Sequence, residues 1–175
     1  NFYITLGIEK ELIIFFIIVL IYLFILNINN KLFMGDSGSY TLSLLCGYFL
    51  IKIYELNQEI SPYFIILLLW YPCFENLFSI IRKFSLKKSP IIADNNHLHQ
   101  LIFIYFKKKN FFKNIDTNNV SSFVIIFYNL IIFLISLSDP NNSQLQIALV
   151  VMNIIIYLFV YFKLFSFKYN LNFKI

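Results

Sequence analysis

The stretch Leu12–Ile28, LIIFFIIVLIYLFILNI, decides the fold class. It contains no charged residue, and Asn27 is its one strongly polar side chain. A transmembrane helix needs about 20 residues, with a range of roughly 17–25, to cross the hydrocarbon core of a bilayer. The stretch therefore predicts a membrane-spanning helix near the beginning of the sequence.

Composition extends this conclusion to the rest of the chain. Of the 175 residues, 59% are hydrophobic and only 13% are charged. A soluble domain carries roughly 25% charged residues, and a single core of this size could not enclose so much apolar surface. We therefore expect an integral membrane protein. The net charge of +5 is better explained by membrane topology than by nucleic acid, so we expect no nucleic-acid partner.

Five apolar runs predict an all-α, polytopic membrane helix bundle with about five transmembrane helices. The second run is short and contains Lys52, but it becomes long enough if it extends back through the preceding Gly-Ser segment. No internal repeat or Pro/Gly/Ser-rich linker divides the sequence, which indicates one membrane domain. The runs are Leu12–Ile28, Tyr40–Ile53, Pro62–Ile81, Val120–Leu137 and Leu145–Phe162.

Basic residues set the orientation of these predicted spans, because basic loops remain cytoplasmic. If the loop 82–119 lies inside, 12 of the 14 Lys and Arg residues face the cytoplasm, and only Lys10 and Lys52 face the other side. Asp36 and the loop 82–119 then share the cytoplasmic face. The two most polar segments of the chain could therefore form one site.

A carboxylate between two glycines follows the first run, in Phe33–Ser39, FMGDSGS. An ionised Asp beside a span is costly, about 3 kcal/mol at the bilayer centre and less near the interface. The glycines allow the backbone to approach an anion closely, and Asp36 offers oxygen to Mg²⁺, which commonly binds one or two carboxylates together with substrate phosphates. Alternatively, Asp36 or a serine simply caps a helix that begins at Tyr40.

The two histidines of the chain, His97 and His99, lie in Ser89–Gln100, SPIIADNNHLHQ. In extended backbone, residues two apart point to the same side. Neutral imidazoles can bind a metal, and protonated or hydrogen-bonding ones can hold a phosphate or a sugar hydroxyl. The alternative is a pair of solvated loop histidines.

Glu75 interrupts the third apolar run, three residues after Pro72. A buried ionisable group in a span indicates function by default. The alternative that we favour is structural, with Glu75 bracing Arg82 or Lys83 across the helix end. Pro72 predicts a kink in the helix nearby.

Residues 12–106 resemble the polyprenyl-phosphate N-acetylhexosamine-1-phosphate transferase family (glycosyltransferase family 4), whose membrane enzymes begin cell-wall and surface-polysaccharide synthesis. Phe33–Ser39 looks like the metal-binding signature of the family. Ser89–Gln100 is similar to its cytoplasmic signature, in which S-P precedes D-x-x-H-x-H-H. Gln100 stands in place of the last His, and Glu75 stands where the family tends to have the Asp of Pro-x-x-Asp.

The resemblance implies transfer of a sugar-1-phosphate from a UDP-sugar to a polyprenyl phosphate, at the cytoplasmic face of the plasma (inner) membrane. It implies that Asp36 is catalytic and binds Mg²⁺, with Mn²⁺ as the alternative metal. It also allows a homodimer. The residues that it assigns to substrate binding are Gly35, Ser37, Gly38, Arg82, Asp94, His97 and His99.

Part of the family pattern is missing from this sequence. Family members carry an Asp-Asp pair and a further acidic segment upstream of the metal loop, but this sequence has no Asp-Asp pair, and residues 1–30 contain no Asp. We therefore interpret residues 1–175 as the C-terminal part of one membrane transferase domain, with a magnesium-aspartate loop at 33–39 and a cytoplasmic histidine loop at 82–119. This piece alone is expected to be inactive. The alternatives are a non-catalytic membrane scaffold or degenerate relative, and a small transporter that uses Asp36 and Glu75 along an ion path.

Overall fold

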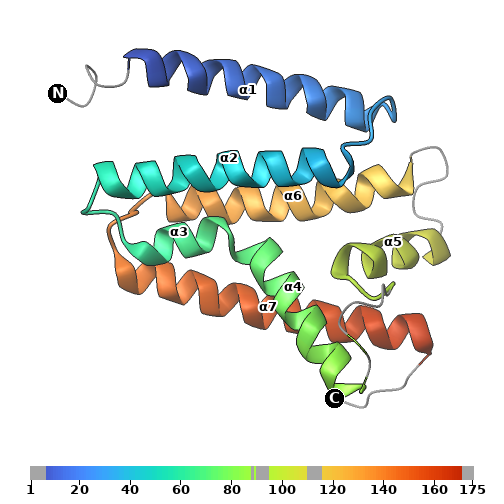
Figure 1. Cartoon of the computed structure of the whole chain (residues 1–175). Helices are drawn as coiled ribbons and strands as arrows, with labels where there is room; N and C mark the ends of the chain where they lie inside the picture. Colours follow the sequence, from blue (N-terminus) through green and yellow to red (C-terminus); the bar gives the residue numbers. More distant parts are fainter. Residues whose placement is uncertain (1–6, 88, 90–94, 110–115, 171–175) are drawn as a thin grey trace. The chain divides into compact units, whose positions relative to one another are not determined.

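A computed structural model describes residues 7–87, 89, 95–109 and 116–170 of the chain. These residues form helices and no strand, which confirms the all-α prediction (Figure 1). The chain divides into two units, residues 1–49 and 50–175, and α2 runs through the boundary. The helices are α1 (Gly7–Ile28), α2 (Gly35–Leu56), α3 (Pro62–Leu68), α4 (Trp70–Ser85), α5 (Leu98–Lys109), α6 (Thr117–Ser136) and α7 (Ser143–Tyr169).

Three of the described helices, α1, α6 and α7, are long and apolar enough to cross a membrane. Helices α3 and α4 pass the same test only when they are taken together as a bent pair. If this pair crosses the membrane as a single broken span, the described helices provide four candidate spans. Helix α2 is 22 residues long but is not among them. Its polar first turn and the charges of Lys52 and Glu55 lower its apolar character. The structure thus supports a helical membrane protein, while the fifth span stays a prediction.

Within the first unit, α1 exposes most of its apolar side chains. Phe15 is 66% exposed, Ile18 59% and Tyr22 62%. On its other side α1 meets α2, where the Phe16 and Phe49 rings lie 5.6 Å apart. A continuous apolar surface of this kind is unfavourable in water, so it fits contact with lipid.

Helices α3 and α4 meet at a sharp bend of 70°. Pro72 lies in the first turn of α4 and has no N–H to donate back to α3, whereas the Cys73 N–H reaches the Leu69 carbonyl at 3.2 Å. The kink expected near Pro72 is confirmed. It turns α4 away from the direction of α3 and toward the start of α5.

The core of the second unit lies where α7 packs against α3 and α5, with α6 beside them. Several polar side chains are buried here within helices of apolar composition. Gln146 and Asn153 of α7 are fully buried, and the Tyr128 hydroxyl of α6 donates to Asn153 Oδ1. The apolar core residues are Leu67, Trp70, Leu98, Leu101, Ile102, Ile132, Leu149, Tyr157 and Tyr161.

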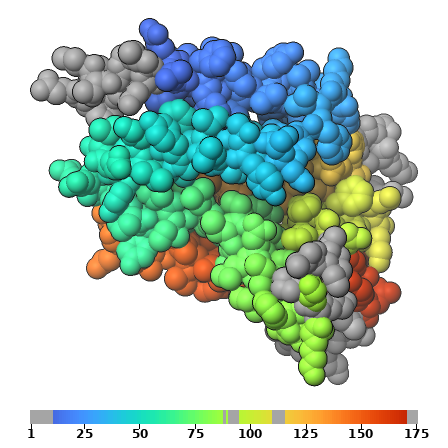
Figure 2. All heavy atoms as spheres, viewed as in Figure 1, coloured from blue at the N-terminus to red at the C-terminus, as the bar shows by residue number. Residues whose placement is uncertain are grey.

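The predicted cytoplasmic loop over residues 82–119 contains a short helix, α5, and its place between membrane spans stays a prediction. Leu98, Leu101 and Ile102 follow helical spacing and are buried. Helix α5 is short and ends in Lys107–Lys109, so a search for long apolar runs overlooks it. Figure 2 shows the surfaces of α4 and α5 beside each other on one face of the second unit.

Candidate functional site

Asp36 lies exposed in the first turn of α2, within the first unit. The helix already begins at Gly35, whose φ of +62° is a conformation that favours glycine. The Ser39 hydroxyl donates to the Gly35 carbonyl at 2.8 Å, inside this first turn. The alternative in which Asp36 caps a helix beginning at Tyr40 is therefore wrong. A carboxylate is favourable at this helix end, and its exposure also leaves it accessible to a cation.

Ser37 and Gly38 line a groove of about 540 Å³ between α1 and α2. Its other walls are mostly apolar and include Phe15 and Leu42. A Cβ atom on Gly38 would lie 2.6 Å from Met34 Cγ, so glycine allows Met34 to pack against this turn. Gly38 thus has a packing role beside this mostly apolar groove.

Glu75, on α4, is buried and receives three hydrogen bonds from two other parts of the second unit. Its Oε1 lies 3.0 Å from both His97 Nδ1 and the Leu98 backbone nitrogen. Its Oε2 accepts from the Tyr157 hydroxyl of α7 at 2.7 Å. Among the described residues Glu75 makes no hydrogen bond with the basic pair at the end of α4, so the bracing interpretation is wrong. The carboxylate instead joins α4, α5 and α7.

His97 and His99 flank the first residue of α5, so the backbone here begins a helix and is not extended. Their rings still stack, with centroids 5.8 Å apart and planes 17° apart. Gln100 Oε1 accepts from the His97 backbone N–H at 3.1 Å, which caps α5. The protein around the His99 ring lowers its pKa by desolvation, an effect that Glu75 opposes and His97 reinforces.

Arg82 holds the turn that precedes α5. Its Nη1 donates to the Asn96 carbonyl at 3.0 Å and to the Tyr161 hydroxyl at 2.8 Å. Its guanidinium carbon lies 5.8 Å and 5.5 Å from the ring centroids of Phe78 and Tyr161. Arg82 therefore stabilises the histidine segment through hydrogen bonds and cation–π contact.

Helix α7 contributes residues that the sequence analysis missed. Lys168 Nζ donates to the Asn95 carbonyl and to Asn96 Oδ1, each at 2.6 Å. Tyr157 and Tyr161 lie four residues apart, and Lys168 follows seven residues later, so all three share one helix face. Side chains that end in a hydroxyl or an ammonium group recur on one face of this otherwise apolar helix. That pattern is the sequence signal that could have identified the three residues.

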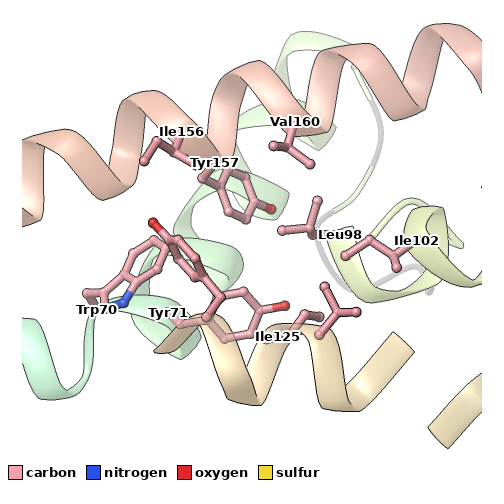
Figure 3. A pocket seen from close by; sticks show the side chains of 10 residues that line it. Trp70, Tyr71, Leu98, Ile102, Ile125, Ile156, Tyr157 and Val160 are labelled. Atoms are coloured by element: carbon pink, nitrogen blue, oxygen red, sulfur yellow. The ribbon is translucent and has the colours of Figure 1, made fainter. Parts of the chain in front are cut away.

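An apolar cavity of about 160 Å³ lies beside the Glu75 cluster and is shown in Figure 3. The Tyr157 ring forms part of its wall, while the hydroxyl of the same residue binds Glu75. The residues that line the cavity are Trp70, Tyr71, Leu98, Ile102, Val124, Ile125, Tyr128, Ile156, Tyr157 and Val160.

The predicted site residues fall into separate groups. Arg82, His97 and His99 come together at the start of α5, and Asp94 lies outside the described residues. Gly35, Asp36, Ser37 and Gly38 belong to the first unit, so a site shared between Asp36 and the histidines stays a prediction.

Within the described ranges, no three His, Cys, Asp or Glu side chains are grouped so that they could hold a metal ion. Asp36 fits Mg²⁺ as a single carboxylate ligand, provided that substrate phosphates supply others. Comparisons with protein-family models, with curated proteins and with solved structures found no match. The case for a function therefore rests on the residues and their geometry.

Proposed function

We propose that this chain is part of a membrane transferase that moves N-acetylhexosamine-1-phosphate from a UDP-sugar to a polyprenyl phosphate. The observation that carries the proposal is the presence of two segments in one membrane chain, Phe33–Ser39 with its Asp36 and Ser89–Gln100 with its two histidines. The concentration of basic residues around Ser89–Gln100, together with Lys31 just before Phe33–Ser39, supports a cytoplasmic reaction face on the plasma membrane.

In the proposed reaction an oxygen of the polyprenyl phosphate attacks the sugar-linked phosphorus of the UDP-sugar. A P–O bond to the lipid forms, the bond to the UMP oxygen breaks, and the products are a lipid diphosphate sugar and UMP. Mg²⁺, or Mn²⁺, bound by Asp36 would neutralise phosphate charge. Gly35, Ser37 and Gly38 would hold the diphosphate through the start of α2. The exposure of Asp36 and the apolar groove beside its turn, which suits an isoprenoid chain, support this assignment.

The second unit would hold the sugar nucleotide. His97 and His99 would contact its phosphates or its sugar, and Arg82 would act as a fixed cation. The lowered pKa of His99 favours a neutral ring near pH 7, which suits a hydrogen bond to a sugar hydroxyl better than an ion pair with phosphate. Asp94 completes the proposed substrate-binding set.

A non-catalytic membrane scaffold is the second candidate. The sequence contains no Asp-Asp pair, and the described residues hold no cluster of three metal-binding side chains. Both observations fit a relative that has lost the chemistry and kept the fold. The two candidates differ in whether Asp36 is needed for turnover.

The deciding experiment measures UMP release from UDP-GlcNAc by the full-length protein in membranes, with undecaprenyl phosphate and Mg²⁺ added. Asp36→Asn should lower the rate by on the order of 10²–10³, because the amide loses the charge that binds Mg²⁺. Glu55→Gln is the matched control, since it makes the same change at an exposed position near the other end of α2. Equal rates for wild type and Asp36→Asn would remove Asp36 from the site, and no release from wild type would favour the scaffold.

A further inference from the structure

We propose that the apolar cavity between α4, α5, α6 and α7 is a binding site for a small, neutral molecule that is mostly apolar and carries one hydrogen-bond acceptor, such as an aryl ether. The acceptor binds the Tyr71 hydroxyl, and the apolar remainder of the molecule fills the space beside it. All residues that line the cavity belong to the second unit, and the proposal does not rest on the proposed transferase function.

The size of the cavity limits what it can hold. Its volume is about 160 Å³. An apolar protein cavity of about 150 Å³ binds benzene, whereas pockets for drug-sized molecules measure about 300–1,000 Å³. A single aromatic ring with a short substituent therefore fits, and a whole phospholipid or a long isoprenoid chain does not.

The apolar wall favours a hydrophobic ligand over water. Aliphatic side chains such as Leu98, Ile102 and Ile125 form much of the lining. A buried water needs two to four polar partners, which a wall of this kind does not supply. Two of the four surrounding helices, α6 and α7, are candidate membrane spans, so a molecule dissolved in the bilayer is the source that we propose.

The polar groups in the wall determine where an acceptor binds. Four lining side chains carry an N–H or O–H group, and three of these groups already donate: the Trp70 ring nitrogen and the hydroxyls of Tyr128 and Tyr157 each bind an oxygen of another side chain. The fourth group, the Tyr71 hydroxyl, is buried and has no hydrogen-bond partner among the described residues. Figure 3 shows the Tyr71 side chain within this wall, between Trp70 and Ile125. A buried hydroxyl without a partner is unfavourable, and an acceptor on the ligand removes that penalty.

Fluorescence of Trp70 reports occupancy of the cavity, because Trp70 is the one tryptophan of the chain and lies in the cavity wall. The probes are 4-bromoanisole and 4-bromotoluene, which differ by one ether oxygen and whose bromine atom quenches an indole that it contacts. We expect both probes to quench the detergent-solubilised wild type in a saturable manner. Val160→Phe places a larger side chain in the wall and should remove the saturable part. Quenching of the wild type that only rises linearly, or that is the same in folded Val160→Phe, would overturn the proposal.

Tyr71→Phe tests whether the hydroxyl recognises the acceptor. The preference for 4-bromoanisole over 4-bromotoluene should be about 2–10-fold larger in the wild type than in Tyr71→Phe, the range expected for one hydrogen bond. Comparing the ratio of the two affinities between the proteins cancels the different solubility of the probes in detergent. Equal ratios in the folded wild type and in folded Tyr71→Phe would refute the role of Tyr71.

Thermal unfolding without a probe tests separately whether the hydroxyl lacks a partner. Tyr71→Phe should melt at the wild-type temperature or above it, because it removes no hydrogen bond. Tyr128→Phe is the matched control in the same wall and should melt about 2–4 °C lower, because it leaves the buried Asn153 Oδ1 without its donor. A Tyr71→Phe protein that melts as low as Tyr128→Phe would show that the hydroxyl already has a partner in the protein, and would overturn the proposal.

Discussion

Gln146→Leu should destabilise the packing of α6 against α7. The Gln146 side chain is fully buried at the start of α7. Its Oε1 accepts from the Ser136 hydroxyl at 2.6 Å, and its Nε2 donates to the carbonyls of Ser136 at 3.1 Å and Asp139 at 2.9 Å. One side chain therefore ties the first turn of α7 to the end of α6 and to the connection between the two helices.

The size of the effect follows from these three bonds. A buried hydrogen bond contributes about 0.5–1.5 kcal/mol in proteins generally and about 0.6 kcal/mol on average between membrane helices. The substitution also leaves the buried Ser136 hydroxyl without its acceptor, while the apolar leucine offsets part of the loss. We expect a net loss of about 2–3 kcal/mol in the free energy of unfolding. For a chain of 175 residues this lowers the melting temperature by about 5–10 °C.

Thermal unfolding of the detergent-solubilised chain, followed by circular dichroism, measures this loss. Gln144→Leu is the matched control, because it makes the same substitution on an exposed side chain of the same helix turn and should change stability by less than about 0.5 kcal/mol. Ser136→Ala combined with Gln146→Leu should recover part of the loss, since no hydroxyl is then stranded. Equal melting temperatures for Gln146→Leu and Gln144→Leu would refute the reasoning.

Two further predictions concern the start of α5. Because its pKa lies below the ordinary value of 6.5, folded His99 binds a proton more weakly than the unfolded chain does. Stability should therefore fall as the pH drops from 7 through 6.5 and below, by more in the wild type than in His99→Gln; identical melting curves against pH would contradict this. Gln100→Ala should lose the cap on the His97 N–H and destabilise the first turn of α5 by about 0.5–1.5 kcal/mol. Hydrogen exchange of the His97 amide should accelerate in Gln100→Ala and not in Gln100→Glu, and equal exchange in all three proteins would exclude the cap.

The helices rich in apolar residues could be predicted from the sequence, because a helix that crosses a bilayer needs a long run of apolar residues and such a run is visible locally. Pro72 correctly indicated the bend between α3 and α4, because a proline lacks the backbone N–H that would continue the helical hydrogen bonds. The first turn of α2 was harder to place, because Gly35–Ser39 is polar. In the structure these residues are helical, and hydroxyls such as that of Ser39 bond to carbonyls one turn back. Hydrophobicity alone cannot detect a helix end of this kind.

In the candidate site, too, some residues could be predicted from the sequence and others could not. Asp36, His97 and His99 stand out in the sequence because polar residue types are rare there. The partners of Glu75 do not, because Tyr157 is 82 residues away in sequence and one of 12 tyrosines. Which tyrosine meets a buried carboxylate depends on how α7 packs against α4, and no local pattern specifies that register.

The start of α5 is held by groups whose roles in stability and in binding are linked. Arg82 and Lys168 bind the turn at Asn96 from two different helices, while Glu75 binds both the ring of His97 and the helix that follows. A buried polar network stabilises the fold only when each member keeps its partners, so truncating one member penalises those left behind. Alanine or leucine at these positions will consequently lower stability and binding together. Substitutions that conserve shape and hydrogen bonding, such as Glu75→Gln, are the ones that can separate the two effects.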